Sequence, residues 1–338
     1  MKTSQFSFDL PEDRIAQVPS ADREAARLLV LDRASGAVSH SSVHDLASWI
    51  NPGTLMVVND SRVRKARVFG TRPDGASAEF LLLAQKGPDL WEAIAGRAGK
   101  PRVGAAFSFP EGVVARLESR DGERRLLRFE PPIDELWLER NGHVPLPPYI
   151  KRPDEAPDQE RYQTVYARHV GSAAAPTAGL HLSSRLLDEL DAKGVKIARV
   201  TLHVGLGTFQ PIRSQDIEDH EMHEESYSIP TETKDLVDEA VRSGKGVLAV
   251  GTTVVRTLES AWGTDGLAAG DGATRLFITP GYEFKVVRRM MTNFHTPGST
   301  LLVLVSAFAG RERILAAYGE AVQRGYRFFS YGDAMLIQ

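Results

Sequence analysis

The carboxyl-terminal half of the chain alternates between helical and extended patterns, and this alternation most restricts the fold. The predicted order after about residue 160 is a helix that Ser184 can cap and Gly194 ends, a strand over 195–204, a helix over 231–243, a strand over 246–250, and a helix that Thr252 or Thr253 opens. Strands that alternate with helices pack in a sheet with the helices on its faces. This half therefore predicts an α/β domain with a largely parallel or mixed sheet.

Residues 62–150 have a different pattern, that of a small all-β domain. Short, partly alternating runs separated by Gly, Pro and Asp turns lie at 67–70, 78–84, 90–95, 105–109, 113–117 and 124–129. Six strands at this spacing are typical of a small barrel or sandwich. The polar, Pro-interrupted segment 151–161 that follows is the best candidate for a linker.

The first 60 residues complete the α/β domain. Apolar runs at 28–33 and 54–60 are typical of buried strands, and a short helix is expected around 43–50 between them. We therefore predict a discontinuous mixed-sheet α/β domain over 1–61 and 151–338, with the β-barrel-like domain inserted in it.

Composition restricts the class of protein further. With 338 residues, 42% hydrophobic and 25% charged, the chain fits a globular protein of about two domains. The absence of cysteine excludes a disulfide framework, a thiolate nucleophile and a Cys-ligated zinc. The amino terminus has no apolar core of signal-peptide length, and the longest apolar run, 301–308, is too short to span a membrane, so we expect a cytoplasmic protein. A net charge of −3 argues against indiscriminate binding of nucleic acid.

Three histidines stand in similar settings. His181, His203 and His295 each lie among Gly, Thr, Ser and Pro, residues that favour turns and exposed backbone. A single histidine of this kind is more often satisfied by a neighbouring carbonyl group than catalytic. Three of them, each beside a short apolar run, predict the wall of a binding site.

Two glycine-containing turns could hold an anion. Gly251, Thr252 and Thr253 lie between a strand and a helix, where backbone N–H groups and the helix dipole favour a carboxylate or phosphate. The second turn contains Gly205, Gly207 and Thr208. Neither turn is a phosphate loop or a dinucleotide fingerprint, and many α/β crossovers of this form bind nothing.

A third candidate site lies where the run 54–60 ends. Asp60 and Arg62 follow this strand, at a position where α/β folds commonly present ligands. The basic residues in this stretch are Arg62, Arg64, Lys65 and Arg67. Near the carboxyl terminus, Tyr331 and Asp333 close an aromatic segment in which one ring could stack on a nucleobase. A solvated charged face and a packed aromatic core explain the same residues without any ligand.

His220 and His223, in a segment rich in glutamate, allow one metal-based alternative. Together with a third histidine they could form the zinc site of a metal-dependent hydrolase. The spacing matches known metal sites weakly, so a polar loop facing a substrate is the preferred interpretation and we predict no metal.

Taken together, the segments resemble one family closely, the S-adenosylmethionine:tRNA ribosyltransferase-isomerases of queuosine biosynthesis. The matching stretches include LPEDRIAQVP (10–19), VVNDSRV (57–63), GSAAAPTAGLH (171–181), VTLHVGLGTFQPI (200–212), AVGTTVVRTLES (249–260), TNFHTPGSTLL (292–302) and YRFFSYGDAMLI (326–337). These stretches run nearly from one end of the chain to the other.

The resemblance implies an α/β domain with an inserted β-barrel, in agreement with the prediction from the residues. It also implies a reaction in which the ribosyl group of S-adenosylmethionine is transferred and isomerised onto 7-aminomethyl-7-deazaguanine in the tRNA anticodon loop. The products are epoxyqueuosine-tRNA, adenine and methionine. S-adenosylmethionine is then a co-substrate, no prosthetic group is needed, and we expect a monomer.

That chemistry suggests roles for the candidate residues. His203 and His181 are the leading acid and base candidates, followed by His295 and Asp60. The turn at Gly251, Thr252 and Thr253, with Gly205, Gly207 and Thr208, is expected to bind S-adenosylmethionine, the first turn through the methionyl carboxylate. Contacts to tRNA or substrate are expected from Arg62, Arg64, Lys65, Arg67, Tyr331 and Asp333. A tRNA-binding module without catalysis and the metal-dependent hydrolase remain the alternatives.

Overall fold

The computed structural model describes residues 1–96, 101–205 and 211–338, and these form two compact units. The first unit contains residues 1–62, 147–152 and 160–338. The second contains residues 63–146 and 153–159. Among the described residues, no helix is long and apolar enough to cross a membrane.

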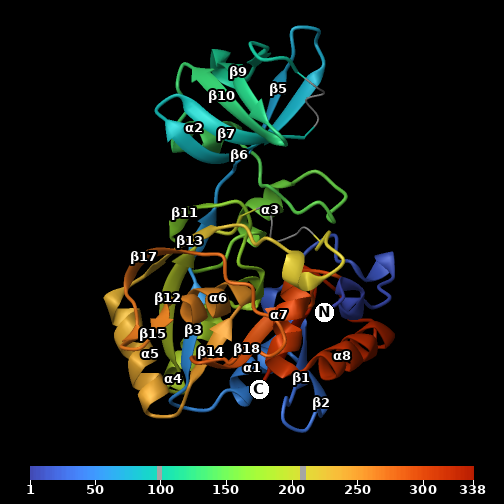
Figure 1. Cartoon of the computed structure of the whole chain (residues 1–338), viewed down its shortest axis with the longest axis vertical. Coiled ribbons are helices and arrows are strands. Elements are labelled where there is room, and N and C mark those ends of the chain that lie inside the picture. The colour runs from blue at the N-terminus through green and yellow to red at the C-terminus, as the bar shows by residue number, and fades with distance from the viewer. Residues whose placement is uncertain (97–100, 206–210) are drawn as a thin grey trace. The chain divides into compact units, whose positions relative to one another are not determined.

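The first unit is built on a mixed sheet, in which nine strands are found among the described residues (Figure 1). Their order across the sheet is β17 (Gly270–Thr274), β13 (Glu225–Ile229), β12 (Lys196–Leu202), β3 (Leu55–Asn59), β14 (Val247–Val250), β18 (Val287–Asn293), β19 (Ala334–Ile337), β1 (Arg27–Leu31) and β2 (Val38–Ser42). The pairs β12–β3, β3–β14, β14–β18 and β19–β1 are parallel, and the other pairs are antiparallel. The prediction of a mixed α/β sheet is confirmed.

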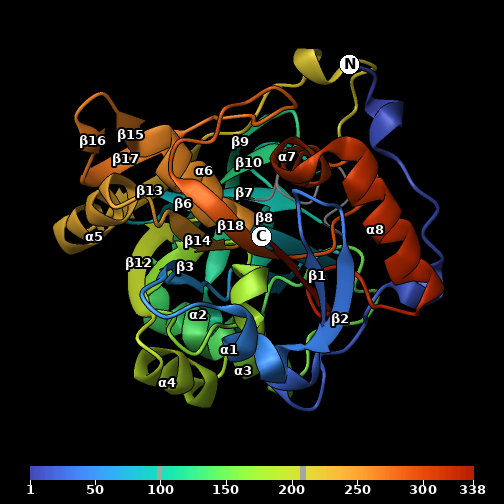
Figure 2. The same cartoon turned by 90° about the horizontal axis from the view of Figure 1, so that it is seen from below.

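Alternate residues of the central strands face two separate apolar cores. Leu29, Val57 and Ala249 face one core, whereas Leu28, Val58 and Leu248 face the other. This period of two is what a strand with helices on both faces requires. The first core is covered by α5 (Thr231–Arg242), α6 (Thr252–Ala261), α7 (Thr300–Ala309) and α8 (Arg311–Gln323), and the second by α1 (Leu46–Trp49) and α4 (Ser184–Ala192), as Figure 2 shows.

Small elements complete this unit. They are the antiparallel pair β15 (Trp262–Gly263) and β16 (Gly266–Leu267), the strand β11 (His169–Ser172), and the 3-10 helices η1 (Thr3–Phe6), η2 (Glu12–Arg14), η3 (Arg23–Ala25), η4 (Val43–Asp45), η6 (Thr177–His181) and η8 (Ile217–Asp219). β4 (Ser61–Val63) pairs with β11 and extends to the first residue of the second unit.

One predicted helix boundary needs correction, and the predicted linker contains a helix. α4 is capped by Ser183, whose hydroxyl accepts from the N–H of Leu186 at 3.0 Å, and the predicted cap Ser184 is the first helical residue. The predicted linker 151–161 contains α3 (Ala156–Arg161), and Asp158 within it is buried and accepts from the N–H of Glu155. Polarity there reflects helix capping as well as exposure.

The second unit is a closed barrel, in which six strands are found among the described residues. Their order is β10 (Arg124–Glu130), β7 (Leu90–Ala95), β6 (Ser77–Gly87), β5 (Arg67–Thr71), β8 (Ala106–Ser108) and β9 (Val114–Asp121), followed in the chain by α2 (Glu135–Asn141); the 3-10 helix η5 (Pro110–Gly112) lies between β8 and β9. The six predicted runs correspond to these strands. An aromatic core of Phe80, Trp91, Phe107 and Phe129 fills the interior.

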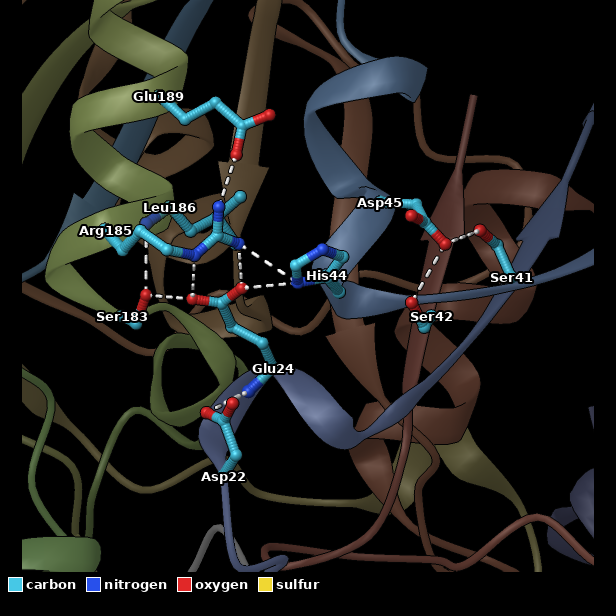
Figure 3. A network of polar contacts seen from close by, with 10 residues as sticks. All are labelled: Asp22, Glu24, Ser41, Ser42, His44, Asp45, Ser183, Arg185, Leu186 and Glu189. Atoms are coloured by element: carbon cyan, nitrogen blue, oxygen red, sulfur yellow. Dashed lines mark hydrogen bonds and ion pairs between the residues drawn. The ribbon is translucent and has the colours of Figure 1, made fainter.

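A buried carboxylate fixes the amino-terminal segment on α4 (Figure 3). Glu24 in η3 accepts hydrogen bonds from the side chains of Ser183 and Arg185 of the α4 region, and His44 Nδ1 lies 3.2 Å from its second oxygen. Burial raises the pKa of Glu24, but the hydrogen bonds from Arg185, Ser183 and His44 outweigh it and lower the pKa. The network thus holds the entrance to β1 in place.

Candidate active site

Four strands end together at one edge of the large sheet. β12, β3, β14 and β18 run parallel, and β19 is antiparallel to β18, so it begins where the other four end. The predicted residues at this edge are Asp60 after β3, His203 after β12, Gly251, Thr252 and Thr253 after β14, His295 after β18, and Tyr331 and Asp333 before β19. In open α/β sheets, ligands bind outside the carboxyl ends of the strands. The topology therefore groups residues that the sequence spreads over more than 270 positions.

Asn59 joins three of these segments and was missed by the sequence analysis. Its amide oxygen accepts from the N–H groups of Leu202 at 3.0 Å and Ser61 at 3.1 Å, and its amide nitrogen donates to Leu202 O at 3.0 Å. The same nitrogen lies 3.4 Å from Thr253 Oγ1. The side chain is fully buried, so these contacts fix the exits of β3 and β12 beside the start of α6.

Asp60 is a buried carboxylate at the exit of β3. Its Oδ1 accepts from Thr201 Oγ1 at 2.7 Å, and its Oδ2 lies 3.9 Å from His169 Nε2. The backbone N–H of Arg168 donates to Asp60 O at 2.7 Å. Asp60 is therefore held in one orientation, as a catalytic or substrate-orienting carboxylate has to be.

His203 lies directly after β12, half-buried against Gly171. A Cβ added to Gly171 would meet His203 Cε1 at 2.9 Å, so only glycine lets this ring lie where it does. His203 lines a cavity of about 470 Å³ with Thr201, Tyr227 and Asp271. Because Thr201 also donates to Asp60, one residue of this cavity wall is hydrogen-bonded to the carboxylate.

The amino terminus of α6 lines a second cavity, here called the Thr253 cavity. Gly251 is the N-cap at φ 94°, a conformation that favours glycine, and it has no side chain to cap the first turn. The other residues that line the cavity are Ala175, Pro176, Thr177, Ala178, Val204, Thr252, Thr253, Thr292, His295 and Leu301. Backbone N–H groups, hydroxyls and a histidine are thus presented to one small space.

His295 and His181 are buried neutral imidazoles. Burial lowers the pKa of His295 to about 3, and its Nε2 lies 2.9 Å from Thr292 Oγ1. Burial, with Arg327, Arg23 and Arg161 nearby, lowers the pKa of His181 to about 3. Because Asn293 Nδ2 donates to His181 Nε2 at 3.1 Å, the neutral ring carries its proton on Nδ1. Neither ring is an imidazolium at neutral pH.

His181 lines a third cavity, which is rich in arginine. Pro19, Ser20, Arg23, Arg161, Leu180, Ser330, Tyr331 and Gly332 line it as well. Arg23 donates to Leu180 O and Glu160 O, each at 3.0 Å, and Arg161 donates to Ala21 O at 2.9 Å. Burial and then Arg161 lower the pKa of Arg23, as expected for like charges held together. Arg23 and Arg161 are far apart in the sequence, so no local pattern predicted this cluster.

A fourth cavity, here called the Arg256 cavity, lies against α6 and the start of α7. Its lining residues are His220, Met222, His223, Glu225, Arg256, Thr300 and Leu301. Arg256 and Glu225 are both about 4% exposed and form an ion pair through Nη1 and Oε2. Leu301 lines both this cavity and the Thr253 cavity.

Most of the remaining predicted residues already have partners within the protein. Tyr331 packs edge-on against Tyr162, with ring centroids 5.8 Å apart. Asp333 accepts from the N–H groups of Arg27 at 3.0 Å and Arg327 at 2.8 Å, so it stabilises the start of β1 and the approach to β19. The basic residues of the barrel unit pair with its carboxylates: Arg64 with Glu135 at 2.6 Å, Lys65 with Glu139 at 3.2 Å and Arg67 with Glu79 at 2.7 Å. Arg62, in the first unit, is exposed.

Two predicted residues lie outside the described part of the chain, and the metal-based alternative has no ligand set within that part. Gly207 and Thr208 lie outside the described residues, whereas the N–H of Gly205 donates to Glu225 Oε1 at 3.0 Å. In the part of the chain that the structure describes, no group of three or more His, Cys, Asp or Glu side chains could hold a metal ion. The zinc site of the hydrolase alternative therefore has no ligand set there.

The fold is that of an α/β protein, and its candidate site lies outside the carboxyl ends of the strands, where such folds commonly bind ligands. The family described as "Queuosine biosynthesis protein" matches residues 3–337. The chain belongs to this family.

Similar proteins cover the whole chain. A protein from Geobacter metallireducens is 51% identical over 346 residues and one from Geobacter sulfurreducens is 49% identical over 342 residues, each with 100% of both chains covered. Both carry the name S-adenosylmethionine:tRNA ribosyltransferase-isomerase. The crystal structure of a Thermotoga maritima S-adenosylmethionine tRNA ribosyltransferase is 36% identical, with a TM-score of 0.59 over 99% of this chain and 100% of that one.

Proposed function

We propose that this protein is a transferase that moves the ribosyl group of S-adenosylmethionine onto 7-aminomethyl-7-deazaguanine in the tRNA anticodon loop. The group is isomerised in the process, and the products are epoxyqueuosine-tRNA, adenine and methionine. The observation that carries the proposal is the match of residues 3–337 to one family, with relatives of this enzymatic name about half identical over their full length. One chain is sufficient, since the proposed substrate-site residues come from the α/β unit.

The chemistry requires a base near the sulfonium. The positive sulfur acidifies the adjacent sugar carbon, so a positioned base can remove a proton there. We assign this role to His203, which lines a cavity with Thr201, and we assign Asp60 to orient the reacting groups through the Thr201 hydroxyl. Gly251, Thr252 and Thr253 bind the co-substrate at the start of α6.

Loss of adenine requires hydrogen bonds or a proton for the purine. His181 and His295 are neutral at neutral pH, because their pKa values are lowered to about 3. They can therefore accept a proton or make hydrogen bonds, but they hold no imidazolium proton to give. We assign both to hydrogen bonding of the substrates, and His181 Nδ1–H is available as a donor by its tautomer.

For tRNA binding we assign the phosphate contacts to Arg23 and Arg161, and we add the exposed Arg62 as a third contact. The first two donate to backbone carbonyl groups rather than to carboxylates, so their charge is not neutralised by those contacts. Arg64, Lys65 and Arg67 have carboxylate partners and contribute less. Three phosphate contacts predict a modest salt dependence, with a slope of roughly −2 in log affinity against log salt for single-stranded RNA.

The proposal is tested by incubating the purified protein with S-adenosylmethionine and tRNA that carries 7-aminomethyl-7-deazaguanine. We expect free adenine and the nucleoside mass of epoxyqueuosine to appear in equal amounts. Binding of the tRNA without either product would instead support a non-catalytic RNA-binding module. His203→Asn should abolish turnover while leaving tRNA binding intact, whereas Arg23→Gln should weaken tRNA binding first.

A further inference from the structure

Arg256 is a buried arginine with one nitrogen that has no partner among the described residues. Its Nη1 pairs with Glu225, and its Nε donates to Leu276 O at 3.1 Å. Its Nη2 is buried, and no described residue accepts a hydrogen bond from it. A guanidinium group removed from water normally satisfies its donors, because a buried unsatisfied donor costs about 1–3 kcal/mol. Such a group in a cavity wall is what an anion site needs.

The start of α7 faces the same cavity. Thr300 and Leu301 are its first two residues, and the capping hydroxyl of Ser299 accepts from Leu302, further into the helix. The first N–H groups of a helix have no partner within it, and the helix dipole adds a partial positive charge there. The Arg256 cavity thus combines a guanidinium N–H donor that has no partner among the described residues with a helix amino terminus, two independent features that favour a carboxylate.

The buried pair itself indicates which anion fits. Arg256 and Glu225 present one cation and one anion side by side, so the cavity has no net charge to attract a simple anion such as phosphate. An α-amino acid carries the complementary pair, a carboxylate and an ammonium group, and it neutralises both partners at once. Met222 supplies an apolar thioether surface beside them.

We infer that the Arg256 cavity binds the α-amino acid end of S-adenosylmethionine, with the carboxylate on Arg256 and the ammonium group on Glu225. This assignment rests on the proposed function and refines it. The carboxylate moves from the turn at Gly251–Thr253 to Arg256, one turn further along α6. Leu301 lines both cavities, so the Thr253 cavity adjoins the Arg256 cavity. The turn at Gly251–Thr253 therefore remains available for the sugar of the same molecule.

The test compares two ligands by calorimetry in the absence of tRNA. S-adenosylmethionine and its decarboxylated analogue differ only in the carboxylate, so the ratio of their dissociation constants isolates that group. We expect the wild-type protein to bind S-adenosylmethionine about 10- to 100-fold more tightly, the range of a charge-assisted hydrogen bond. The paired variant Arg256→Met with Glu225→Gln, which removes both charges together, should reduce the ratio to about 3 or less.

Two further variants keep the test decisive. His223→Glu adds a carboxylate at an exposed position in the cavity wall, so it should weaken S-adenosylmethionine more than the analogue even if the paired variant does not fold. Arg275→Lys, in an exposed ion pair with Glu224 outside the cavity, should leave the ratio unchanged. Equal binding of both ligands by the wild type, or an unchanged ratio in both cavity variants, overturns the assignment. If the wild type binds neither ligand, the proposed function itself fails.

Discussion

Asn59 offers the most direct test of how the sheet edge is held together. Replacing it by alanine removes three hydrogen bonds of 3.0–3.1 Å to backbone groups of Leu202 and Ser61, all in a fully buried environment. The longer contact of 3.4 Å to Thr253 adds little. Each lost bond leaves a buried backbone group unsatisfied, at about 1–2 kcal/mol. We therefore expect Asn59→Ala to lower the free energy of unfolding by about 3–6 kcal/mol, a large part of the stability of a typical domain.

Ser61→Ala is the matched control. Ser61 is equally buried and lies two residues away, but its hydroxyl has no hydrogen-bond partner among the described residues. Its removal should change stability by less than about 0.5 kcal/mol. Urea unfolding followed by circular dichroism gives the two midpoints, and hydrogen exchange of the peptides over 55–61 and 196–202 locates the effect. Equal midpoints for the two variants would refute the role assigned to Asn59.

The remaining predictions concern pH, packing and titration. Glu24→Gln should lower the free energy of unfolding by about 1–2 kcal/mol at neutral pH. Because the native pKa of Glu24 lies below its unfolded value, the difference from the wild type should disappear as the pH falls below about 4.3. Urea midpoints measured across this pH range would show it. Gly332→Ala should lower the free energy of unfolding by about 2 kcal/mol or more, since its Cβ would lie 2.5 Å from Arg327 O. Gly319→Ala in α8 places its Cβ in open space and should raise the free energy of unfolding by about 0.5–1 kcal/mol. Thermal unfolding of the two variants would show this difference. The rings of His181 and His295 should show no NMR titration between about pH 5 and 8. Because both rings stay neutral in the native state but can be protonated in the unfolded state, each lowers the stability of the fold as the pH falls below about 6.5. A ring that titrates between about pH 5 and 8 would contradict the burial argument.

Much of the fold could be predicted because local patterns decide it. The continuous apolar run at 54–60, the partly alternating runs of the barrel strands and the turn residues between those strands are visible in the sequence itself. The boundaries were less accurate where neighbouring residues offer the same chemistry. Either Ser183 or Ser184 can cap a helix, and only the bond from Leu186 shows that Ser183 does.

The sequence predicted only those site residues that lie in loops with a recognisable local composition. Histidines among glycines and threonines drew attention, and the topology then grouped them at one edge. Asn59 and Arg256 were missed because their partners are distant in sequence: Leu202 is 143 positions from Asn59, and Glu225 is 31 positions from Arg256. A buried asparagine or arginine inside an apolar run gives no local sign of the contacts that it will make. The order of strands in the sheet, which sets those contacts, is not encoded in any one segment.

The most direct test of the proposed activity is to follow which carbons of S-adenosylmethionine reach the tRNA. The co-substrate is supplied in two forms, labelled with carbon-13 either in the ribose or in the methyl group, and the modified nucleoside is analysed by mass spectrometry. The ribosyl transfer proposed here predicts that the ribose label enters the nucleoside while the methyl label leaves in free methionine. Methyl label in the nucleoside, or ribose label remaining with adenine, would contradict it.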